Sequence, residues 1–275
     1  VSTGCNVPKI DGDKLVRGLP AFVDDITPAG LLYAKVLRSP HAHARIKNVD
    51  ITKAMALAGV VDVIWHKDVK QIPHTRAGQS YPEPSPYDYT VMPTKARFIG
   101  DRVAVVVAVS LRIAEDALGL IDVEYEVLPS VTDFTQALDS DVLIHEEPDP
   151  RGISKGGESN LAAMIDVHLG DVDKALEECD VVISRVYNLP RVQAAHVEPH
   201  ISMAWIDEDN RLIVRTSTQV PFHLRRMLAT VLEMPESKIR VIKPRVGGGF
   251  GDKQELVCED LVSVLAIRSG KPVRL

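Results

Sequence analysis

A glycine-rich stretch near the C-terminal end of the chain has the residue types and spacing to hold an electronegative ligand. Residues 246–253 read Val-Gly-Gly-Gly-Phe-Gly-Asp-Lys. Glycine tolerates positive φ and lets backbone N–H groups approach a ligand closely. The spacing excludes a Walker phosphate loop, because Gln254 follows the lysine, and a dinucleotide fingerprint, because Asp252 stands where the third glycine is required.

Two kinds of group in and near this stretch predict ligand contacts. The first comprises Gly248, Gly249 and Gly251 with Phe250, whose ring could lie against a flat ligand or plug the loop beneath. The second is Gln219, which follows an apolar strand pattern; a glutamine at the carboxyl end of a strand offers a donor and an acceptor. The structural alternatives are a plain glycine turn and a glutamine that faces solvent.

Three further polar residues, His196, Glu198 and His200, share a period-two spacing. In a strand such side chains point to one side, where nitrogen and oxygen atoms could bind a metal ion. Pro199 and the missing fourth ligand weaken that interpretation. We therefore favour hydrogen-bonded polar residues beside a ligand channel.

Composition narrows the function classes. The chain has 275 residues, of which 45% are hydrophobic and 25% charged, with a formal net charge of -6. This balance gives no indication of nucleic-acid binding, and no apolar run approaches the roughly 18 residues of a membrane span. Cys5, Cys179 and Cys258 are widely separated, which disfavours a disulfide scaffold, a zinc site and an iron–sulfur cluster held by this chain alone. We expect a reducing, cytoplasmic location.

Hydrophobic periodicity predicts the elements that position these residues. Strands are predicted at 31–37, 60–65, 101–109, 121–127, 181–189, 201–206, 212–214 and 239–242. Helices are predicted at 51–58, 113–119, 174–178, 223–234 and 256–267. The glycine stretch then opens onto a helix N-terminus, which favours an anion. Strand 101–109, helix 113–119 and strand 121–127 suggest one small α/β unit.

Prolines, glycines and polar runs divide the chain into units. We predict an extended arm at 1–15, a first unit at 16–128, a linker at 129–145 and a second unit at 146–275. The proline-rich residues 71–93 read as a long surface loop. Because the final residues begin a strand pattern, we expect the chain to be part of a larger subunit.

In this order, the motifs resemble those of the xanthine dehydrogenase/aldehyde oxidase family of molybdenum hydroxylases. The matching segments are Arg38–Ile46, Ala54–Val60, Gly100–Ala104, His196–Pro199, Ser217–Gln219, Val246–Lys253 and Gly270–Arg274. The resemblance runs from about Asp11 to the end. Among members, the sequence is most similar to bacterial xanthine-dehydrogenase-like molybdenum subunits.

The resemblance implies a mixed fold of α+β and α/β character. An α/β hammerhead domain would occupy 16–128, and the first, incomplete part of a molybdopterin-binding domain would occupy 146–275. The implied cofactor is a molybdopterin, possibly as its cytosine dinucleotide, that carries molybdenum. Gln219 and the loop Gly248–Gly251 match the family's contacts to the molybdenum centre and pterin. Hydroxylation with water as oxygen source is implied, with electrons passing to 2Fe-2S clusters and FAD on partner subunits or domains.

The departures from the family pattern limit these expectations. The family's catalytic glutamate belongs to the second cofactor-binding half, so no catalytic residue is assigned here, and neither Glu255 nor Glu259 inherits its role. Gln254 stands where purine-hydroxylating members carry glutamate and is a candidate for the substrate funnel. Purines, nicotinate-like heterocycles and aldehydes all stay open. The alternative functions are a non-catalytic assembly module of the same fold and an unrelated phosphate-binding protein.

Overall fold

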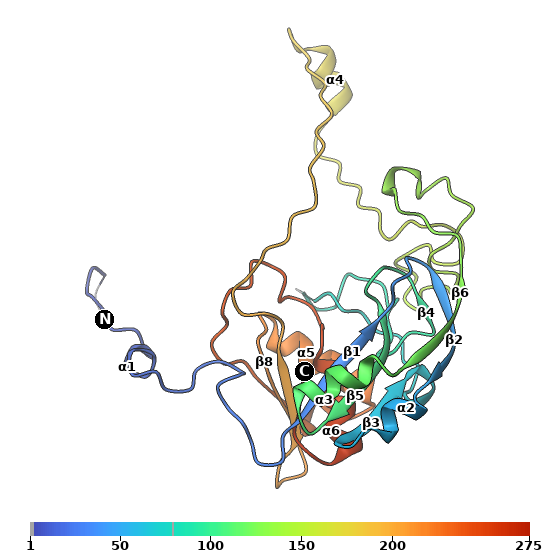
Figure 1. The fold of residues 1–275 in the computed structure, drawn as a ribbon. Helices are drawn as coiled ribbons and strands as arrows, with labels where there is room; N and C mark the ends of the chain where they lie inside the picture. Colours follow the sequence, from blue (N-terminus) through green and yellow to red (C-terminus); the bar gives the residue numbers. More distant parts are fainter. Residues whose placement is uncertain (1–2, 79) are drawn as a thin grey trace.

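The computed structural model describes residues 3–78 and 80–275 (Figure 1). Residues 1, 2 and 79, which belong to the predicted arm and the predicted loop, lie outside the described residues. The helices are α1 Gly12–Val16, α2 Thr52–Ala56, α3 Leu111–Leu118, α4 Val172–Glu177, α5 Pro221–Leu232 and α6 Glu259–Ser269. The strands are β1 Leu32–Arg38, β2 Ala44–Asp50, β3 Val60–Trp65, β4 Lys95–Ala96, β5 Arg102–Ala108, β6 Asp122–Val127, β7 Ser202–Ile206, β8 Leu212–Thr216, β9 Ile239–Ile242 and β10 Val273–Arg274.

Two sheets organise the described residues. The larger has seven strands in the order β3-β5-β1-β10-β7-β8-β9, and the smaller has three in the order β4-β2-β6. Strands from the first and second units meet where β1 pairs in parallel with β10, with Leu32 opposite Val273. The large sheet therefore continues across the predicted linker, and the mixed fold expected from the sequence is confirmed.

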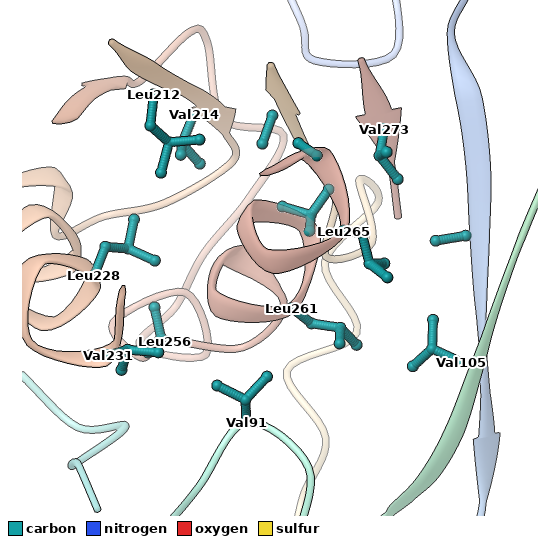
Figure 2. Close-up of a cluster of buried hydrophobic side chains, with 14 of the residues drawn as sticks. Val91, Val105, Leu212, Val214, Leu228, Val231, Leu256, Leu261, Leu265 and Val273 are labelled. Atoms are coloured by element: carbon teal, nitrogen blue, oxygen red, sulfur yellow. The ribbon is translucent and has the colours of Figure 1, made fainter. Parts of the chain in front are cut away.

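The two faces of the large sheet bury separate hydrophobic cores. One core lies between the sheet and helices α5 and α6, and Figure 2 shows its leucine and valine side chains. The other lies between the opposite face, helices α2 and α3, and strand β2 of the small sheet. Strand β5 is buried along its whole length, and from Ala104 to Ala108 its residues alternate between the two cores, because side chains alternate between the faces of a strand.

The strand, helix and strand predicted within 101–127 are present as β5, α3 and β6, but the two strands lie in different sheets, since β5 pairs with β1 and β3 whereas β6 pairs with β2. One prediction about local structure was wrong. The predicted extended arm contains helix α1 at its end, where backbone bonds such as Leu15 N–H to Asp11 C=O close a short turn. Local periodicity identifies an element but does not choose its partner.

A second wrong prediction concerns residues 181–189, which form no strand. They belong to a segment that we call the excursion, residues 162–193, in which every residue is exposed. Figure 1 shows the excursion rising away from the sheets to α4 and returning. A strand requires a neighbouring backbone, and none of the described residues pairs with this segment. Asp171 caps α4, accepting a hydrogen bond from the Lys174 N–H at 3.0 Å.

The helix after the glycine stretch begins later than predicted. Helix α6 starts at Glu259, so the stretch does not open directly onto a helix N-terminus. The carboxylate of Glu259 itself accepts hydrogen bonds from the N–H groups of Val257 and Cys258, at 2.9 and 3.0 Å. Glu259 thus binds the two backbone N–H groups that precede α6. Within the described residues, no helix combines the length and apolar character needed to cross a bilayer.

Candidate functional site

Parallel pairing of β8 with β9 brings the two predicted groups of site residues together. Val214 lies opposite Val241 in this pair, so the carboxyl ends of both strands meet at one edge of the sheet. Gln219 follows β8 and the glycine loop, residues 246–253, follows β9. Ligands of open sheets commonly bind at such an edge.

The backbone of the glycine loop takes conformations that favour glycine. Gly248 and Gly251 both have φ of +100°. Phe250 has φ of +52° although it carries a side chain, and that side chain is 77% exposed. A non-glycine residue held at positive φ is uncommon and clusters at ligand-binding sites. The ring therefore lies on the surface and does not plug the loop.

Gln219 contacts this loop directly. The Gly251 N–H donates to Oε1 of Gln219 at 3.2 Å, which assigns the oxygen to the loop side and leaves the carboxamide NH₂ as the group offered to a ligand. A Cβ on Gly249 would lie 2.5 Å from the same oxygen, so any larger residue there would displace the Gln219 carboxamide. Among the described residues, the N–H groups of Gly248, Gly249 and Phe250 donate no hydrogen bond.

The remaining predicted site residue, Gln254, lies in the turn that closes the loop. Its N–H donates to the Gly251 carbonyl at 3.2 Å, and its Oε1 lies 4.0 Å from where a Cβ on Gly251 would stand. The structure thus brings all six sequence-predicted residues to one place. They are Gln219, Gly248, Gly249, Phe250, Gly251 and Gln254. The arrangement offers hydrogen-bond donors to an electronegative ligand.

His196, Glu198 and His200, which share the period-two spacing, do not lie on one face of a strand. They lie outside any strand, and Ala195 beside them has φ of +49°. The rings of His196 and His200 meet edge to face with centroids 5.1 Å apart. Oε2 of Glu198 accepts from the Ser217 hydroxyl at 2.5 Å and from the Gly247 N–H at 2.7 Å. Among the described residues, no group of three or more His, Cys, Asp or Glu side chains is placed to hold a metal ion.

Glu198 also meets Lys253, a residue that the sequence interpretation did not assign. Lys253 Nζ lies 3.0 Å from Oε2 of Glu198 and is almost fully buried. Burial alone would raise the pKa of Glu198, but the hydrogen bonds from Ser217 and Gly247 and the nearby ammonium outweigh it and lower this pKa. The only sequence signals were the lysine within the glycine motif and the isolated glutamate.

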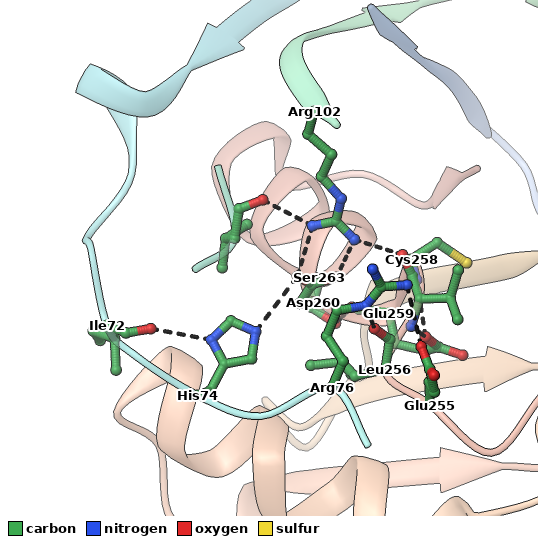
Figure 3. A network of polar contacts seen from close by, with 12 residues as sticks. Ile72, His74, Arg76, Arg102, Glu255, Leu256, Cys258, Glu259, Asp260 and Ser263 are labelled. Atoms are coloured by element: carbon green, nitrogen blue, oxygen red, sulfur yellow. Dashed lines mark hydrogen bonds and ion pairs between the residues drawn. The ribbon is translucent and has the colours of Figure 1, made fainter. Parts of the chain in front are cut away.

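The two carboxylates that were denied a catalytic role on sequence grounds are engaged elsewhere. Glu255 pairs with Arg76 at 3.4 Å, and Figure 3 shows this pair beside the Leu256 carbonyl to which Arg76 also donates. Glu259 accepts a hydrogen bond from the Thr216 hydroxyl at 2.6 Å. Both carboxylates are used to join segments of the chain.

A buried ion pair beside the site joins the two units. The guanidinium of Arg102, on β5, donates to both carboxylate oxygens of Asp260 on α6, at 2.7 and 3.0 Å. Figure 3 shows this pair together with His74, whose Nε2 lies 3.9 Å from Asp260. Burial opposes the charge of Arg102, but the facing carboxylate prevails and raises the pKa of Arg102. A buried ion pair therefore connects β5 of the first unit to α6 of the second.

Comparison with known proteins assigns both units. Residues 17–129 match the aldehyde oxidase and xanthine dehydrogenase a/b hammerhead domain, and residues 153–275 match the molybdopterin cofactor-binding domain. The chain is 42% identical to the probable hypoxanthine oxidase XdhD of Escherichia coli K12, over 98% of this chain and 31% of that protein. It is 33% identical to the nicotinate dehydrogenase large molybdopterin subunit of Eubacterium barkeri, over 99% of this chain and 60% of that subunit.

Solved structures agree with these matches. Quinoline 2-oxidoreductase from Pseudomonas putida 86 superposes with a TM-score of 0.78 at 32% identity, over 98% of this chain and 34% of that one. This chain spans about a third of the length of most of the relatives it matches. With the hammerhead and cofactor-binding domains both matched, the chain belongs to the xanthine dehydrogenase/aldehyde oxidase family of molybdenum hydroxylases.

Proposed function

We propose that this chain provides one wall of the molybdenum cofactor site in a hydroxylase that uses water as its oxygen source. The observation that carries the proposal is the junction of Gln219 with the glycine loop, where the Gly251 N–H meets Oε1 of Gln219 at 3.2 Å. The carboxamide NH₂ and the loop N–H groups offer donors without a metal-ligand set, which fits a metal held by its own organic ligand. Family membership supports the same assignment.

Each residue of the site has a distinct task in this proposal. The NH₂ group of Gln219 donates to an electronegative atom of the cofactor, and the N–H groups of Gly249 and Phe250 donate beside it. The Phe250 ring, which is exposed, would lie against the bound cofactor. When bound, the molybdopterin, possibly as its cytosine dinucleotide, supplies the redox chemistry that hydroxylates an electron-poor carbon. Because this chain holds no assigned base, proton removal belongs to the rest of the subunit.

The substrate that we propose is a purine, ahead of other N-heterocycles and aldehydes. The relative with 42% identity is named a probable hypoxanthine oxidase, while another at 33% is a nicotinate dehydrogenase subunit. Gln254, next to the loop, can donate one hydrogen bond to a heterocycle and accept another. Partners would be the second cofactor-binding half and iron–sulfur and FAD subunits or domains. A cytoplasmic location stays a prediction from cysteine usage.

The test uses the full-length protein purified with its native partners. Molybdenum and pterin are measured, and turnover of hypoxanthine, nicotinate and an aldehyde is followed with ¹⁸O-labelled water. Labelled product with molybdenum present supports the proposal. A stable complex without molybdenum or pterin indicates the non-catalytic module, and binding of a nucleotide without molybdenum indicates a phosphate-binding protein.

Gln254→Glu examines the substrate assignment separately. A carboxylate can accept two hydrogen bonds from a purine edge, so we expect kcat/KM for hypoxanthine to rise by about tenfold, the equivalent of one charge-assisted hydrogen bond. The value for an aldehyde, which lacks that edge, should change little. An equal change for both substrates would place Gln254 outside the substrate funnel.

A further inference from the structure

We infer that Lys253, Glu198 and Ser217 act as a positioning clamp, which holds Gln219 and the glycine loop in the geometry that binds the cofactor. We call these three residues the Lys253 clamp. The inference rests on the proposed function, because the clamp acts through Gln219 and the loop. It assigns a task to a lysine and a glutamate that neither a metal site nor a phosphate loop accounts for.

The ammonium group of Lys253 is fully satisfied inside the protein. Its Nζ donates to the Glu198 carbonyl at 2.8 Å, to Oε2 of Glu198 at 3.0 Å and to the Ser217 hydroxyl at 2.8 Å. Lys253 is only 1% exposed. An ammonium group has three N–H donors, and here each has its own acceptor. A buried lysine that is paired in this way tolerates little movement, because any lost acceptor leaves a buried charge unsatisfied.

These contacts join three segments that are distant in the sequence. Glu198 Oε2 also accepts from the Gly247 N–H at 2.7 Å, and the Glu198 N–H donates back to the Gly247 carbonyl at 3.1 Å. The Gln219 N–H donates to the Lys253 carbonyl at 2.8 Å. The start of the loop, its end and the residue after β8 are thus tied to one buried ion pair. A shift of Lys253 moves Gln219 and both ends of the loop.

Shape complementarity fixes the same arrangement. A Cβ on Gly247 would lie 2.4 Å from the Glu198 Cβ, and a Cβ on Gly249 would lie 2.5 Å from Oε1 of Gln219. Glu198 therefore packs closely against Gly247, and Gln219 packs closely against Gly249.

Burial also separates this inference from a direct role for the lysine. A lysine that binds a phosphate must reach the ligand, whereas Lys253 is covered and its donors are occupied. The Phe250 side chain of the same loop is 77% exposed. Lys253 is therefore a positioning residue, and its influence on a ligand passes through Gln219 and the loop backbone.

The test measures cofactor retention in the full-length protein. Lys253→Met keeps the length of the side chain but removes its charge and its three hydrogen bonds. We expect molybdenum per folded protein to fall by about tenfold, as for other residues that orient metal-site contacts. The Mo(V) electron paramagnetic resonance spectrum of the retained fraction should change, because the groups around the metal centre move. Ser217→Ala removes one acceptor, and a loss of about fivefold, the equivalent of one hydrogen bond, is expected.

Lys95→Met is the matched control. Lys95 is 2% exposed, pairs with Glu146 at 3.2 Å and lies on β4 of the small sheet. This variant should retain wild-type molybdenum and an unchanged spectrum. If Lys253→Met does the same, the clamp is only structural and the inference fails, while the proposed function stands. A wild-type protein without molybdenum overturns both. Should Lys253→Met not fold, Ser217→Ala decides by the same measurements.

Discussion

The glycine loop and the excursion lie in the same matched domain, residues 153–275, yet they are built in opposite ways. The loop has an exposed upper surface and a buried base in which Lys253, Glu198 and Ser217 satisfy one another. The excursion is apolar in large part and exposed throughout. Its large apolar side chains include Met164, Ile165, Val167, Leu169, Val181, Ile183, Val186, Tyr187, Leu189 and Val192.

The difference shows which parts of the domain the chain can complete by itself. The polar groups at the base of the loop find their partners within the chain, so the site geometry forms here. The apolar groups of the excursion find none among the described residues, although exposed apolar surface of this extent usually marks an interaction site.

The largest expected effect of this difference is on proteolysis. In the isolated chain, trypsin should cut after Arg185 and Arg191 in the excursion about a thousandfold faster than after Lys253, since opening the ordered region requires several kcal/mol whereas the excursion is already open. Mass spectrometry of timed digests measures both rates. Comparable rates at the two places would show that the loop is not held more firmly than the excursion.

Only part of this contrast could be predicted from the sequence. The strand, loop and helix around the glycine stretch follow local patterns, and parallel β8 and β9 bring Gln219 to the loop. The burial of Lys253 does not follow from them, because its acceptors come from Glu198 and Ser217, which are 55 and 36 positions away in the sequence. A lysine in a glycine motif otherwise indicates an exposed cation.

The excursion was mispredicted for a related reason. Residues 181–189 have the β-branched composition of a strand, but a strand also needs a partner, which local composition does not supply. Likewise, the pattern of β5 and β6 fits strands of one sheet as well as strands of two. Tertiary pairing, which the sequence pattern leaves open, decides both cases.

The second prediction concerns the contribution of the buried Arg102–Asp260 ion pair to the free energy of unfolding. Arg102→Met leaves the carboxylate of Asp260 buried without its cation, so we expect a loss of about 3–5 kcal/mol in the free energy of unfolding. Urea denaturation measures it. The control is Arg268→Met, which removes a more exposed pair with Asp62 and should lower the stability by less than about 1 kcal/mol. Equal losses of unfolding free energy in the two variants would show that the buried Arg102–Asp260 pair stabilises the protein no more than the exposed pair does.

The third prediction concerns the linker segment that precedes the excursion. Burial, assisted by the nearby Arg97, lowers the pKa of His145 to about 4 from 6.5, so the folded protein resists protonation there. The unfolded chain takes up this proton below pH 6.5. Above pH 6.5, His145 is neutral in both states and does not affect the free energy of unfolding. Between pH 6.5 and about 4 this free energy falls as the pH drops, by up to about 1.4 kcal/mol per pH unit. His145→Gln should flatten this dependence in urea denaturation series; an unchanged slope would contradict the assignment.

The fourth prediction concerns a substitution on the exposed surface of the loop, which should change local hydrogen bonding but hardly affect the buried base. Gly249→Ala places a methyl carbon 2.5 Å from Gln219 Oε1, so the carboxamide must leave the Gly251 N–H. Because Gln219 is exposed and can turn into solvent, the free energy of unfolding should change by less than about 1 kcal/mol. Hydrogen exchange at the Gly251 amide should accelerate. Gly119→Ala, where the nearest atom would be 3.5 Å away, is the control and should leave that amide unchanged.

The smallest effect is expected in the excursion itself. Ile183→Asp introduces a charge at a side chain that is 72% exposed, so the free energy of unfolding of the isolated chain should change by less than about 0.5 kcal/mol. Ile64→Asp, at a fully buried position on β3, should prevent folding. Thermal unfolding measures both. If Ile183→Asp lowers the melting temperature of the isolated chain substantially, the excursion already packs against it. If the same substitution destabilises only the full-length protein, the side chain is buried there by residues outside this chain.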